Sequence, residues 1–186
     1  IREWIAEHVS RGIKGIQHAV LCLPGETAEI ERLIRLRHPK VPLVAVERLP
    51  KVYARMVARF AELGLAERTT FLPKELKTVL GESCPGEYSG IVLDFCGTLA
   101  KSYAMLYECL ANDMVVRGGR VALTLIRRSG CVKDSDDYRW LKTMAEICPS
   151  ALRKKFPGLT TESLFGCLSG FSGYKLVGAR KYRNPP

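Results

Sequence analysis

The chain reads His18-Ala-Val-Leu-Cys-Leu23, then the turn Pro24-Gly-Glu-Thr-Ala28, then Ile30, Leu33 and Ile34 at helical spacing. The first stretch is apolar at nearly every position, which is typical of a strand that helices cover on both faces. The apolar residues after the turn recur at i, i+3 and i+4, as on one face of a helix. This segment therefore predicts a buried strand, a turn and a helix, the first β-α unit of the chain.

The same unit recurs along the sequence. Val41-Pro-Leu-Val-Ala-Val46 predicts a second buried strand, followed by a helix from Pro50 to a stop at Gly64. A weaker strand is expected around Arg68 to Leu72, and strong ones at Ile91–Asp94 and Arg120–Ile126. The other expected elements are a helix from Ile1 to about Gly12, a helix on Leu99, Tyr103, Leu106 and Leu110 that ends near Gly118-Gly119, a helix from about Asp134 to Cys148, and a hairpin or bent strands around Ser163–Leu168 and Tyr174–Lys181. The alternation predicts a doubly wound, mostly parallel, Rossmann-like α/β sheet with helices on both faces.

A length of 186 residues suits a single domain over residues 1–186, with an N-terminal helix within 1–16 and C-terminal strands and a basic tail within 159–186. With 47% hydrophobic and 26% charged residues, the composition disfavours disorder and coiled coil. No apolar run approaches the roughly 20 residues of a membrane span, and the opening residues do not resemble a signal peptide. We therefore expect a cytoplasmic protein with no membrane partner. The sequence begins at Ile1 rather than at a methionine. It indicates no oligomeric state.

The cysteines and histidines indicate structural roles. Seven cysteines are scattered without a C-x-x-C pair, and three histidines show no metal-ligand spacing. We expect a reducing compartment, no metal centre, and free cysteines such as Cys22 that behave as small buried hydrophobic residues.

Positive charge is concentrated toward the C-terminus. The net charge is +10, and residues 120–186 contain thirteen basic and five acidic side chains. Phe171, Tyr174 and Tyr182 lie among these charges, and aromatic rings can stack on bases. The pattern predicts a surface that binds nucleic acid, with a solvated basic face as the alternative.

In a doubly wound sheet, ligands bind at the carboxyl ends of the strands, near the point where the strand order reverses. The turn after the first strand contains Gly25, which allows close approach of a ligand to the backbone. Glu47 follows the second strand, 23 positions beyond Pro24, near the spacing at which an acid reaches the ribose hydroxyls of an adenosine. The alternative role for Glu47 is an exposed charge paired with Arg48 at the end of a strand.

The charge of the first turn discriminates between adenosine ligands. Glu26 stands where a dinucleotide pyrophosphate would meet the amides and dipole of the helix, and it would repel that anion. The sequence also lacks G-x-x-x-x-G-K-[ST], which removes a P-loop. S-adenosylmethionine, which has no phosphate and carries a sulfonium cation, is more compatible with this turn than NAD or ATP.

From about Gln17 to Arg128 the chain resembles the class I, Rossmann-like methyltransferases that use S-adenosylmethionine. The resemblance lies in four stretches: Val20-Leu-Cys-Leu-Pro-Gly25, Val44-Ala-Val-Glu-Arg48, Val92-Leu-Asp-Phe-Cys-Gly97 and Arg117-Gly-Gly-Arg-Val-Ala122. The glycine loop is degenerate, because Cys22 stands for the family's acid and Pro24, Glu26 and Ala28 stand for its glycines. The residues that the resemblance places at the cofactor are Leu23, Pro24, Gly25, Glu47 and Arg48. It places Asp94 as the catalytic carboxylate that holds the methyl acceptor or takes its proton, with Phe95, Cys96 and Gly97 lining the substrate side.

Several alternatives stay open. Asp94 could serve only as a helix N-cap, and Cys96 could act as a nucleophile toward a pyrimidine, although Phe95 replaces the usual proline before it. At the level of function, the main alternative is a methyltransferase-like, non-catalytic nucleic-acid-binding module. An NAD-linked oxidoreductase is disfavoured by Glu26 and the missing glycines.

Overall fold

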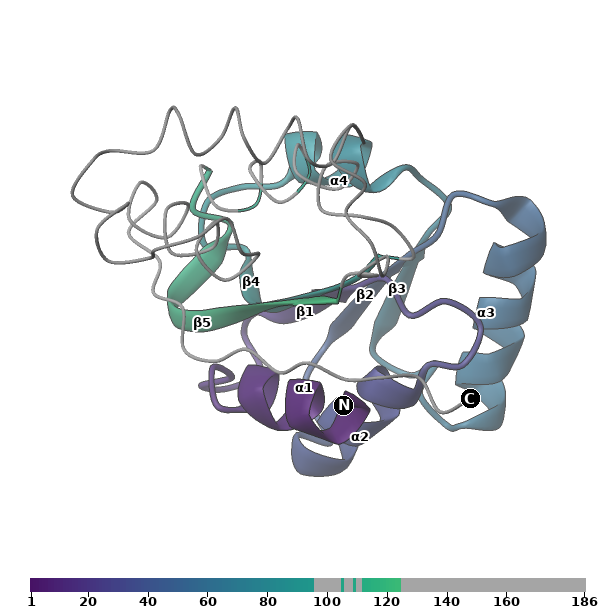
Figure 1. Ribbon diagram of the computed structural model, residues 1–186, viewed down its shortest axis with the longest axis horizontal. Coiled ribbons are helices and arrows are strands. Elements are labelled where there is room, and N and C mark those ends of the chain that lie inside the picture. The colour runs from purple at the N-terminus through teal and green to yellow at the C-terminus, as the bar shows by residue number, and fades with distance from the viewer. Residues whose placement is uncertain (96–104, 106–108, 110–111, 125–186) are drawn as a thin grey trace, which may run out of the picture. The chain divides into compact units, whose positions relative to one another are not determined.

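A computed structural model describes residues 1–95, 105, 109 and 112–124. Within them the chain forms a sheet flanked by helices (Figure 1), in the order α1 (Arg2–Ser10), β1 (Ala19–Cys22), α2 (Glu29–Arg37), β2 (Leu43–Val46), α3 (Pro50–Glu62), β3 (Thr69–Leu72), α4 (Leu76–Glu82), β4 (Tyr88–Asp94) and β5 (Val115–Thr124). Two compact units divide the chain: residues 1–95 with 112–124, and residues 96–111 with 125–186. The elements above all belong to the first unit, and the expectation of a single domain over 1–186 stays a prediction.

The sheet is parallel throughout, with strand order β3-β2-β1-β4-β5. The chain moves outward from β1 through β2 to β3, then crosses back to β4 on the other side of β1. The strand order therefore reverses between β1 and β4, and their carboxyl ends form the topological switch point. The predicted doubly wound, Rossmann-like α/β fold is confirmed.

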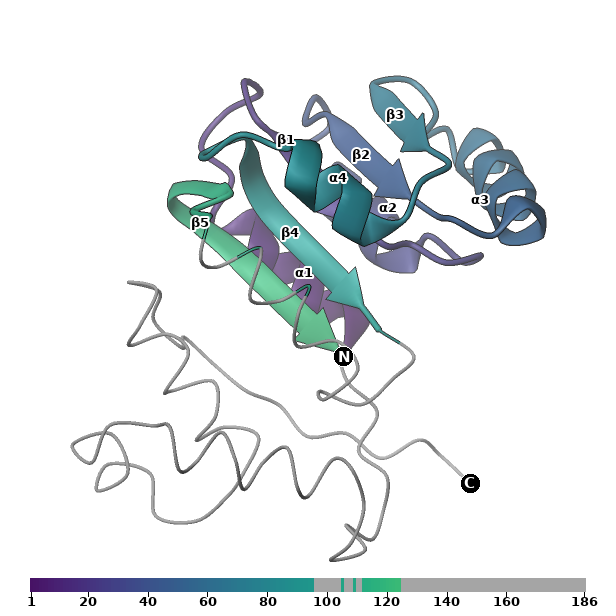
Figure 2. The ribbon, with the colours of Figure 1, turned by 90° about the horizontal axis from the view of Figure 1, so that it is seen from above.

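Helices cover both faces of this sheet. In Figures 1 and 2, α1 and α2 lie on one face and α4 lies on the other. Right-handed crossovers explain the arrangement, because the connection from β3 to β4 runs in the opposite direction to those from β1 to β2 and from β2 to β3. The helix between β3 and β4 therefore reaches the opposite face.

The core on the α1 and α2 side is built from alternate strand residues. Val20 and Cys22 of β1 point to this face and are fully buried, and Val92 of β4 joins them. Helices fill the space above with apolar side chains at helical spacing: Ile5, Ala6 and Val9 from α1, Ile30 and Ile34 from α2, and Met56 and Phe60 from α3. For α2 and α3, the apolar periodicity that predicted the helix is thus the pattern of side chains that it buries.

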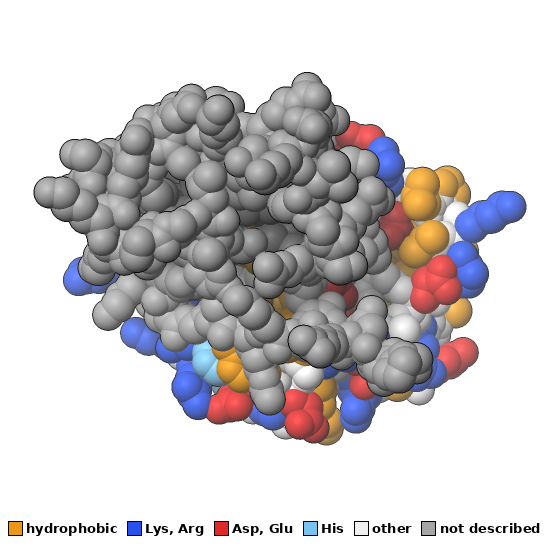
Figure 3. Space-filling model, in the orientation of Figure 1, with side chains coloured by type: hydrophobic (Ala, Val, Ile, Leu, Met, Phe, Trp, Pro, Cys, Tyr) orange, Lys and Arg blue, Asp and Glu red, His pale blue; other side chains and the backbone are white. Residues whose placement is uncertain are grey.

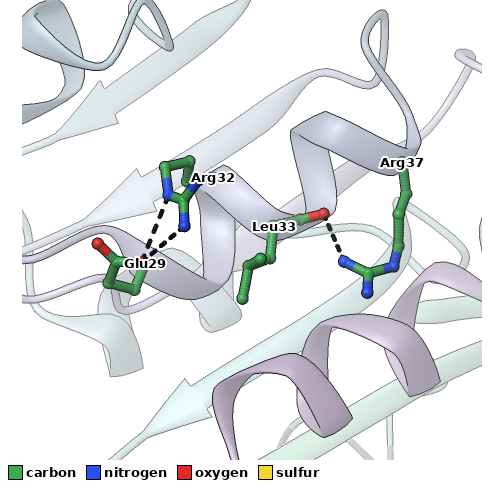
Figure 4. A network of polar contacts seen from close by, with 4 residues as sticks. All are labelled: Glu29, Arg32, Leu33 and Arg37. Carbon is green, nitrogen blue, oxygen red and sulfur yellow. Dashed lines mark hydrogen bonds and ion pairs between the residues drawn. The ribbon is translucent and has the colours of Figure 1, made fainter.

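Charged side chains of α2 form contacts within the helix, as Figure 4 shows. Arg32 donates to the Glu29 carboxylate from Nη2 at 3.2 Å, one turn along the helix. Near the end of the helix, Arg37 Nη1 donates to the carbonyl oxygen of Leu33 at 3.0 Å. A cation at this end also interacts favourably with the helix dipole. These contacts stabilise the exposed face of α2.

The structure corrects several of the expected elements. Strand β4 begins at Tyr88 rather than Ile91, and β5 begins at Val115 rather than Arg120. Helix α1 ends at Ser10, before the expected Gly12. Helix α4 was not predicted, because its seven residues are too few to show a clear period. Gly118 and Gly119 lie inside β5 rather than at the end of a helix. The predicted elements at Leu99–Leu110, Asp134–Cys148, Ser163–Leu168 and Tyr174–Lys181 lie wholly or mostly outside the described residues.

The two glycines belong to an irregular pairing of β4 with β5. From the pair Tyr88 and Val115 to the pair Gly90 and Arg120, β4 advances by two residues and β5 by five. A Cβ at Gly119 would lie 2.7 Å from the carbonyl oxygen of Ser89 and 2.2 Å from Val115 Cγ1. The bulge therefore needs a residue without a side chain here.

Candidate functional site at the switch point

A shallow hollow, whose enclosed part has about 10 Å³, lies at the carboxyl ends of β1 and β4. Its walls come from the N-terminus of α1, the turn between β1 and α2, the first turn of α2 and the end of β4. The lining residues are Arg2, Leu23, Pro24, Thr27, Glu29, Ile30, Glu31 and Asp94. The structure therefore brings together three of the predicted site residues, Leu23, Pro24 and Asp94.

The turn between β1 and α2 holds two residues in left-handed backbone conformations. Gly25 has φ of 58°, and no described atom lies within 4 Å of the position of an added Cβ. Ala28, directly before α2, has φ of 52° and ψ of 28° and is fully buried. A left-handed conformation is ordinary for glycine and strained for alanine. Ala28 therefore holds, at a cost in backbone strain, a conformation that glycine would adopt freely.

Glu31 is the buried acid of the site, and sequence reasoning missed it. It belongs to α2 and is only 1% exposed. Burial raises the pKa of its carboxyl from 4.5 to about 7, its own backbone N–H opposes this rise, and the Asp94 charge adds to it. The contacts with Cys22 and Arg2 favour the ionised form. The one sequence feature that could have indicated the burial of Glu31 was its position next to the apolar stripe of Ile30 and Ile34.

Cys22, the last residue of β1, lies next to Glu31 of α2. It is fully buried, as expected. Its thiol donates to the carbonyl oxygen of Val44 at 3.4 Å and lies within hydrogen-bonding reach of the Glu31 carboxyl. Burial, followed by the negative charge of Glu31, raises the pKa of the thiol well above its usual value. Cys22 is therefore a neutral thiol and a poor nucleophile.

Asp94 ends β4 and is exposed at the rim of the hollow. Its Oδ1 accepts a hydrogen bond from the hydroxyl of Thr124, which lies opposite it in the β4–β5 register. The neighbouring strand thus orients the carboxylate. Of the three residues expected beside it, Phe95 is partly buried, and Cys96 and Gly97 lie outside the described residues.

Glu47 and Arg48 follow β2 at the same edge of the sheet but do not line the hollow. Glu47 Oε1 accepts a hydrogen bond from the backbone N–H of Leu49 at 2.7 Å. Arg48 forms an ion pair with Glu75, at 3.0 Å between Nη1 and Oε1. Arg48 is therefore paired with Glu75, the residue directly before α4, and not with Glu47. The binding of ribose by Glu47 stays a prediction.

Glu26 is paired as well. Its Oε1 lies 2.7 Å from Arg55 Nη2 on α3, with both side chains about half exposed. The cation reduces the repulsion that Glu26 would exert on an anion at the turn. Glu26 therefore disfavours a phosphate ligand less in the folded chain than the sequence alone indicates.

The described part of the chain has few features beyond this site. It contains no group of three His, Cys, Asp or Glu side chains that could hold a metal ion. None of its helices is both long enough and apolar enough to cross a bilayer. In Figure 3 the side chains of Lys and Arg alternate with those of Asp and Glu along the lower rim, so that no surface of one charge gathers there. The basic segments after residue 125 lie outside the described residues.

The fold defines a class, the Rossmann-like α/β proteins, in which ligands commonly bind at the switch point, where this hollow lies. No protein-family model and no curated protein matches the chain. Solved structures do match. A protein of Corynebacterium glutamicum has a TM-score of 0.52 at 14% identity, over 76% of this chain and 70% of its own. Precorrin 8w decarboxylase of Methanobacterium thermoautotrophicum has a TM-score of 0.52 at 15% identity, over 78% and 69%.

A third solved structure is the SAM-dependent methyltransferase from Agrobacterium tumefaciens. Its TM-score is 0.52 at 16% identity, over 81% of this chain and 49% of its own. These likenesses show the fold, which this chain shares with methyltransferases that use S-adenosylmethionine.

Proposed function

We propose that the chain is a methyltransferase that uses S-adenosylmethionine. A fold of this kind hosts many activities, so the support must come from the site. The observation that carries the proposal is the hollow at the switch point, where the turn after β1 meets the exposed carboxylate of Asp94 and the buried carboxyl of Glu31. The carboxyl groups of Glu29, Glu31 and Asp94 and the guanidinium of Arg2 line the place where the ligand would be held.

The turn after β1 and the end of β2 would hold the cofactor. Leu23, Pro24 and Gly25 form the turn, where the open side of Gly25 leaves room for a ligand against the backbone. Strands β1 and β2 are parallel neighbours, so Glu47 emerges at the same edge of the sheet. Its carboxylate has acceptor capacity beyond the one bond to Leu49, which suits two ribose hydroxyls. Arg48 would flank the same subsite.

The size of the hollow limits what it can take. Sites for drug-sized ligands enclose roughly 300 to 1,000 Å³, and the enclosed part of this hollow has about 10 Å³, the room of roughly one water molecule. Most of a bound cofactor would therefore lie along the open edge of the sheet toward Glu47.

Asp94 would act on the methyl acceptor. S-adenosylmethionine supplies an electrophilic methyl group on a sulfonium sulfur. The carboxylate of Asp94 can hold the acceptor in line with that group and take the proton that it loses, and positioning accounts for much of the rate of such a transfer. The hydroxyl of Thr124 fixes one carboxylate oxygen and leaves the other for the acceptor. Phe95, Cys96 and Gly97, which follow directly, would contribute to the acceptor side.

Calorimetric titration with S-adenosylmethionine, joined to an assay of methyl transfer, tests the proposal. We expect the chain to bind the cofactor, and Asp94→Asn to keep binding while transfer falls about 100-fold or more, the scale of a lost general base. Glu62→Gln is the matched control, because Glu62 is an exposed acid on α3 paired with Arg59, away from the hollow. Absence of binding at millimolar cofactor would refute the proposal.

Nucleic acid is the acceptor class that we propose. The support is the net charge of +10 and its concentration in residues 120–186, which contain thirteen basic and five acidic side chains. The same charge favours the second candidate, a non-catalytic module that binds nucleic acid through this fold. An oligonucleotide that binds with strong salt dependence, while no adenosyl ligand binds, would favour the module.

A further inference from the structure

A group of cations lies at the end of the sheet opposite the hollow. The strands are parallel, so the amino ends of β1, β4 and β5 share one edge. Helix α1 packs against β4 and β5 and ends at this edge, where Figures 1 and 2 both show its last residues beside the start of β5. The loop after α1 contains Lys14, and the first half of β5 contains Arg117 and Arg120.

The loop after α1 and the bulge of β5 approach each other closely. A Cβ at Gly118 would lie 3.1 Å from Lys14 Nζ. A Cβ at Gly12 would lie 3.1 Å from Arg120 Cγ and 3.0 Å from the Arg120 backbone nitrogen. Lys14 therefore lies against the residue that follows Arg117, and the stem of Arg120 lies against the end of α1. Two segments that are far apart in the sequence thus bring three cationic side chains together.

These three cations have no acidic partner within the described part of the chain. The ion pairs there join other residues. Glu87 and Asp113 belong to loops at the same edge and pair with none of the three, and Glu87 instead accepts a hydrogen bond from a backbone N–H at 2.8 Å. Lys14 and Arg117 are exposed, and Arg120 is partly buried. Grouped cations repel one another, and an anion that binds among them offsets this repulsion.

Phosphate is an anion that suits these side chains. The guanidinium of arginine presents a planar fork of donors that matches two phosphate oxygens, and lysine binds phosphate as a compact point charge. Ile16, in the same loop as Lys14, is 53% exposed and offers an apolar contact beside the cations. A chain of phosphates with sugars and bases between them presents both kinds of group, as in a nucleic acid strand.

We propose that Lys14, Arg117 and Arg120 form a surface, here called the bulge surface, that binds the phosphates of a nucleic acid strand. It lies toward the other end of β5 from Thr124, which is opposite Asp94 in the register. Arg120 is four positions before Thr124, about 13 Å at about 3.3 Å per residue. The bulge surface therefore holds the strand away from Asp94 and positions it without reading its bases. The inference rests on the proposed function for the class of partner, and it requires no cofactor.

The test removes the three charges and keeps polar side chains in their place. Lys14→Gln, Arg117→Gln and Arg120→Gln together should weaken binding of a single-stranded oligonucleotide of about 20 nucleotides about tenfold or more at low salt. The slope of log K against log salt should fall in magnitude by about 2, since each lost phosphate contact removes about 0.7. Fluorescence anisotropy on the full chain, over a range of salt concentrations, measures both quantities.

The matched control removes the same charge from other places. Lys40→Gln, Lys51→Gln and Lys77→Gln together change exposed lysines outside the bulge surface, and this variant should keep the slope of the original chain. If the triple variant of the bulge surface does not fold, Lys14→Gln and Arg117→Gln are tested singly. Both side chains are exposed, and each change should lower the magnitude of the slope by about 0.7.

Two further probes define the partner. Single-stranded DNA and RNA of one sequence should lose affinity alike on the triple variant of the bulge surface, because both present the same phosphates. Polyglutamate of similar length carries carboxylates instead, and its affinity should change less. Equal losses for polyglutamate and the oligonucleotides would show a surface for any polyanion and would overturn the proposal.

The inference and the proposed function fail separately. If the original chain binds no oligonucleotide, or if the bulge variant keeps the slope of the original chain, the inference is overturned. Titration of the same proteins with S-adenosylmethionine tests the methyltransferase independently, because the bulge surface and the hollow lie at opposite ends of the sheet. Oligonucleotide binding that depends on the bulge surface, with no binding of the cofactor, would support the inference and refute the methyltransferase.

Discussion

Glu31 shows how one side chain can make a fold sensitive to pH. Its pKa is about 7 in the folded chain, against 4.5 for an ordinary glutamate. The folded chain therefore binds more protons than the unfolded chain between these values, and stability falls as pH rises from about 4.5 to about 7. The contribution is fully present below pH 4.5 and lost as pH rises through 7.

Glu31→Gln should remove this dependence. A shift of this size corresponds to about 3 kcal/mol between pH 4.5 and pH 8. We expect urea unfolding of the original chain to show a loss of this order across the range, and the variant to show a flatter profile and greater stability at pH 8. Glu29→Gln, two positions away and paired at the surface, should leave the profile within about 1 kcal/mol of the original. Parallel profiles for the original chain and the Glu31 variant would contradict the assignment.

At the scale of elements, the β4–β5 pairing depends on close backbone approach. A Cβ at Gly119 would meet the carbonyl oxygens of Ser89 and Val116 at 2.7 and 3.0 Å. A Cβ at Gly90 would meet Val9 Cγ1 of α1 at 2.7 Å, and a side chain can move aside where backbone cannot. Gly119→Ala should therefore destabilise the fold by about 2 to 3 kcal/mol, and Gly90→Ala by less. Denaturant unfolding of both variants measures the order, and a smaller loss at Gly119 would contradict it.

Helix α4, by contrast, has a glycine with room for a side chain. Gly81 lies within its last turn, and no described atom lies within 4 Å of an added Cβ. Glycine in a helix costs roughly 0.5 to 1 kcal/mol relative to alanine, because it loses more backbone freedom on folding. Gly81→Ala should raise the free energy of unfolding by up to about 1 kcal/mol. A loss of stability would show that α4 has less room at this position than its geometry indicates.

At the scale of the whole molecule, charge is the property to test. If residues after 125 bind nucleic acid, replacing Arg153, Lys154 and Lys155 together with alanine should weaken binding of a single-stranded oligonucleotide. The slope of log K against log salt should fall in magnitude by about 2, since each lost phosphate contact removes about 0.7. Fluorescence anisotropy over a range of salt concentrations measures both.

The control removes the same charge elsewhere, with alanine at Lys40, Lys51 and Lys77, which are exposed in the described part of the chain. It should change the slope little. Equal losses in the two triple variants would show that net charge alone, and no local surface, governs binding.

The sequence by itself determined the architecture of the described part. Continuous apolar runs predicted β1, β2 and β4, and the spacing from Pro50 to Gly64 predicted α3, because buried parallel strands and half-buried helices leave these patterns in any chain that forms them. The pattern failed where it was short, as in α4, or where a bulge placed Gly118 and Gly119 inside a strand. Glycine indicates a turn and a bulge equally well along a sequence.

Only the tertiary structure decided the partners of the charged groups. Sequence distance suggested Arg48 as a partner for Glu47, and the fold pairs Arg48 with Glu75, and Glu26 with Arg55. Glu31 reads as an ordinary helix acid, yet the fold brings it to Cys22, Asp94 and Arg2 and buries it. The physical reason is that periodicity reports which face of an element is buried. The environment of a charge depends on residues far along the chain, which only the pairing of β1 with β4 in the sheet brings together.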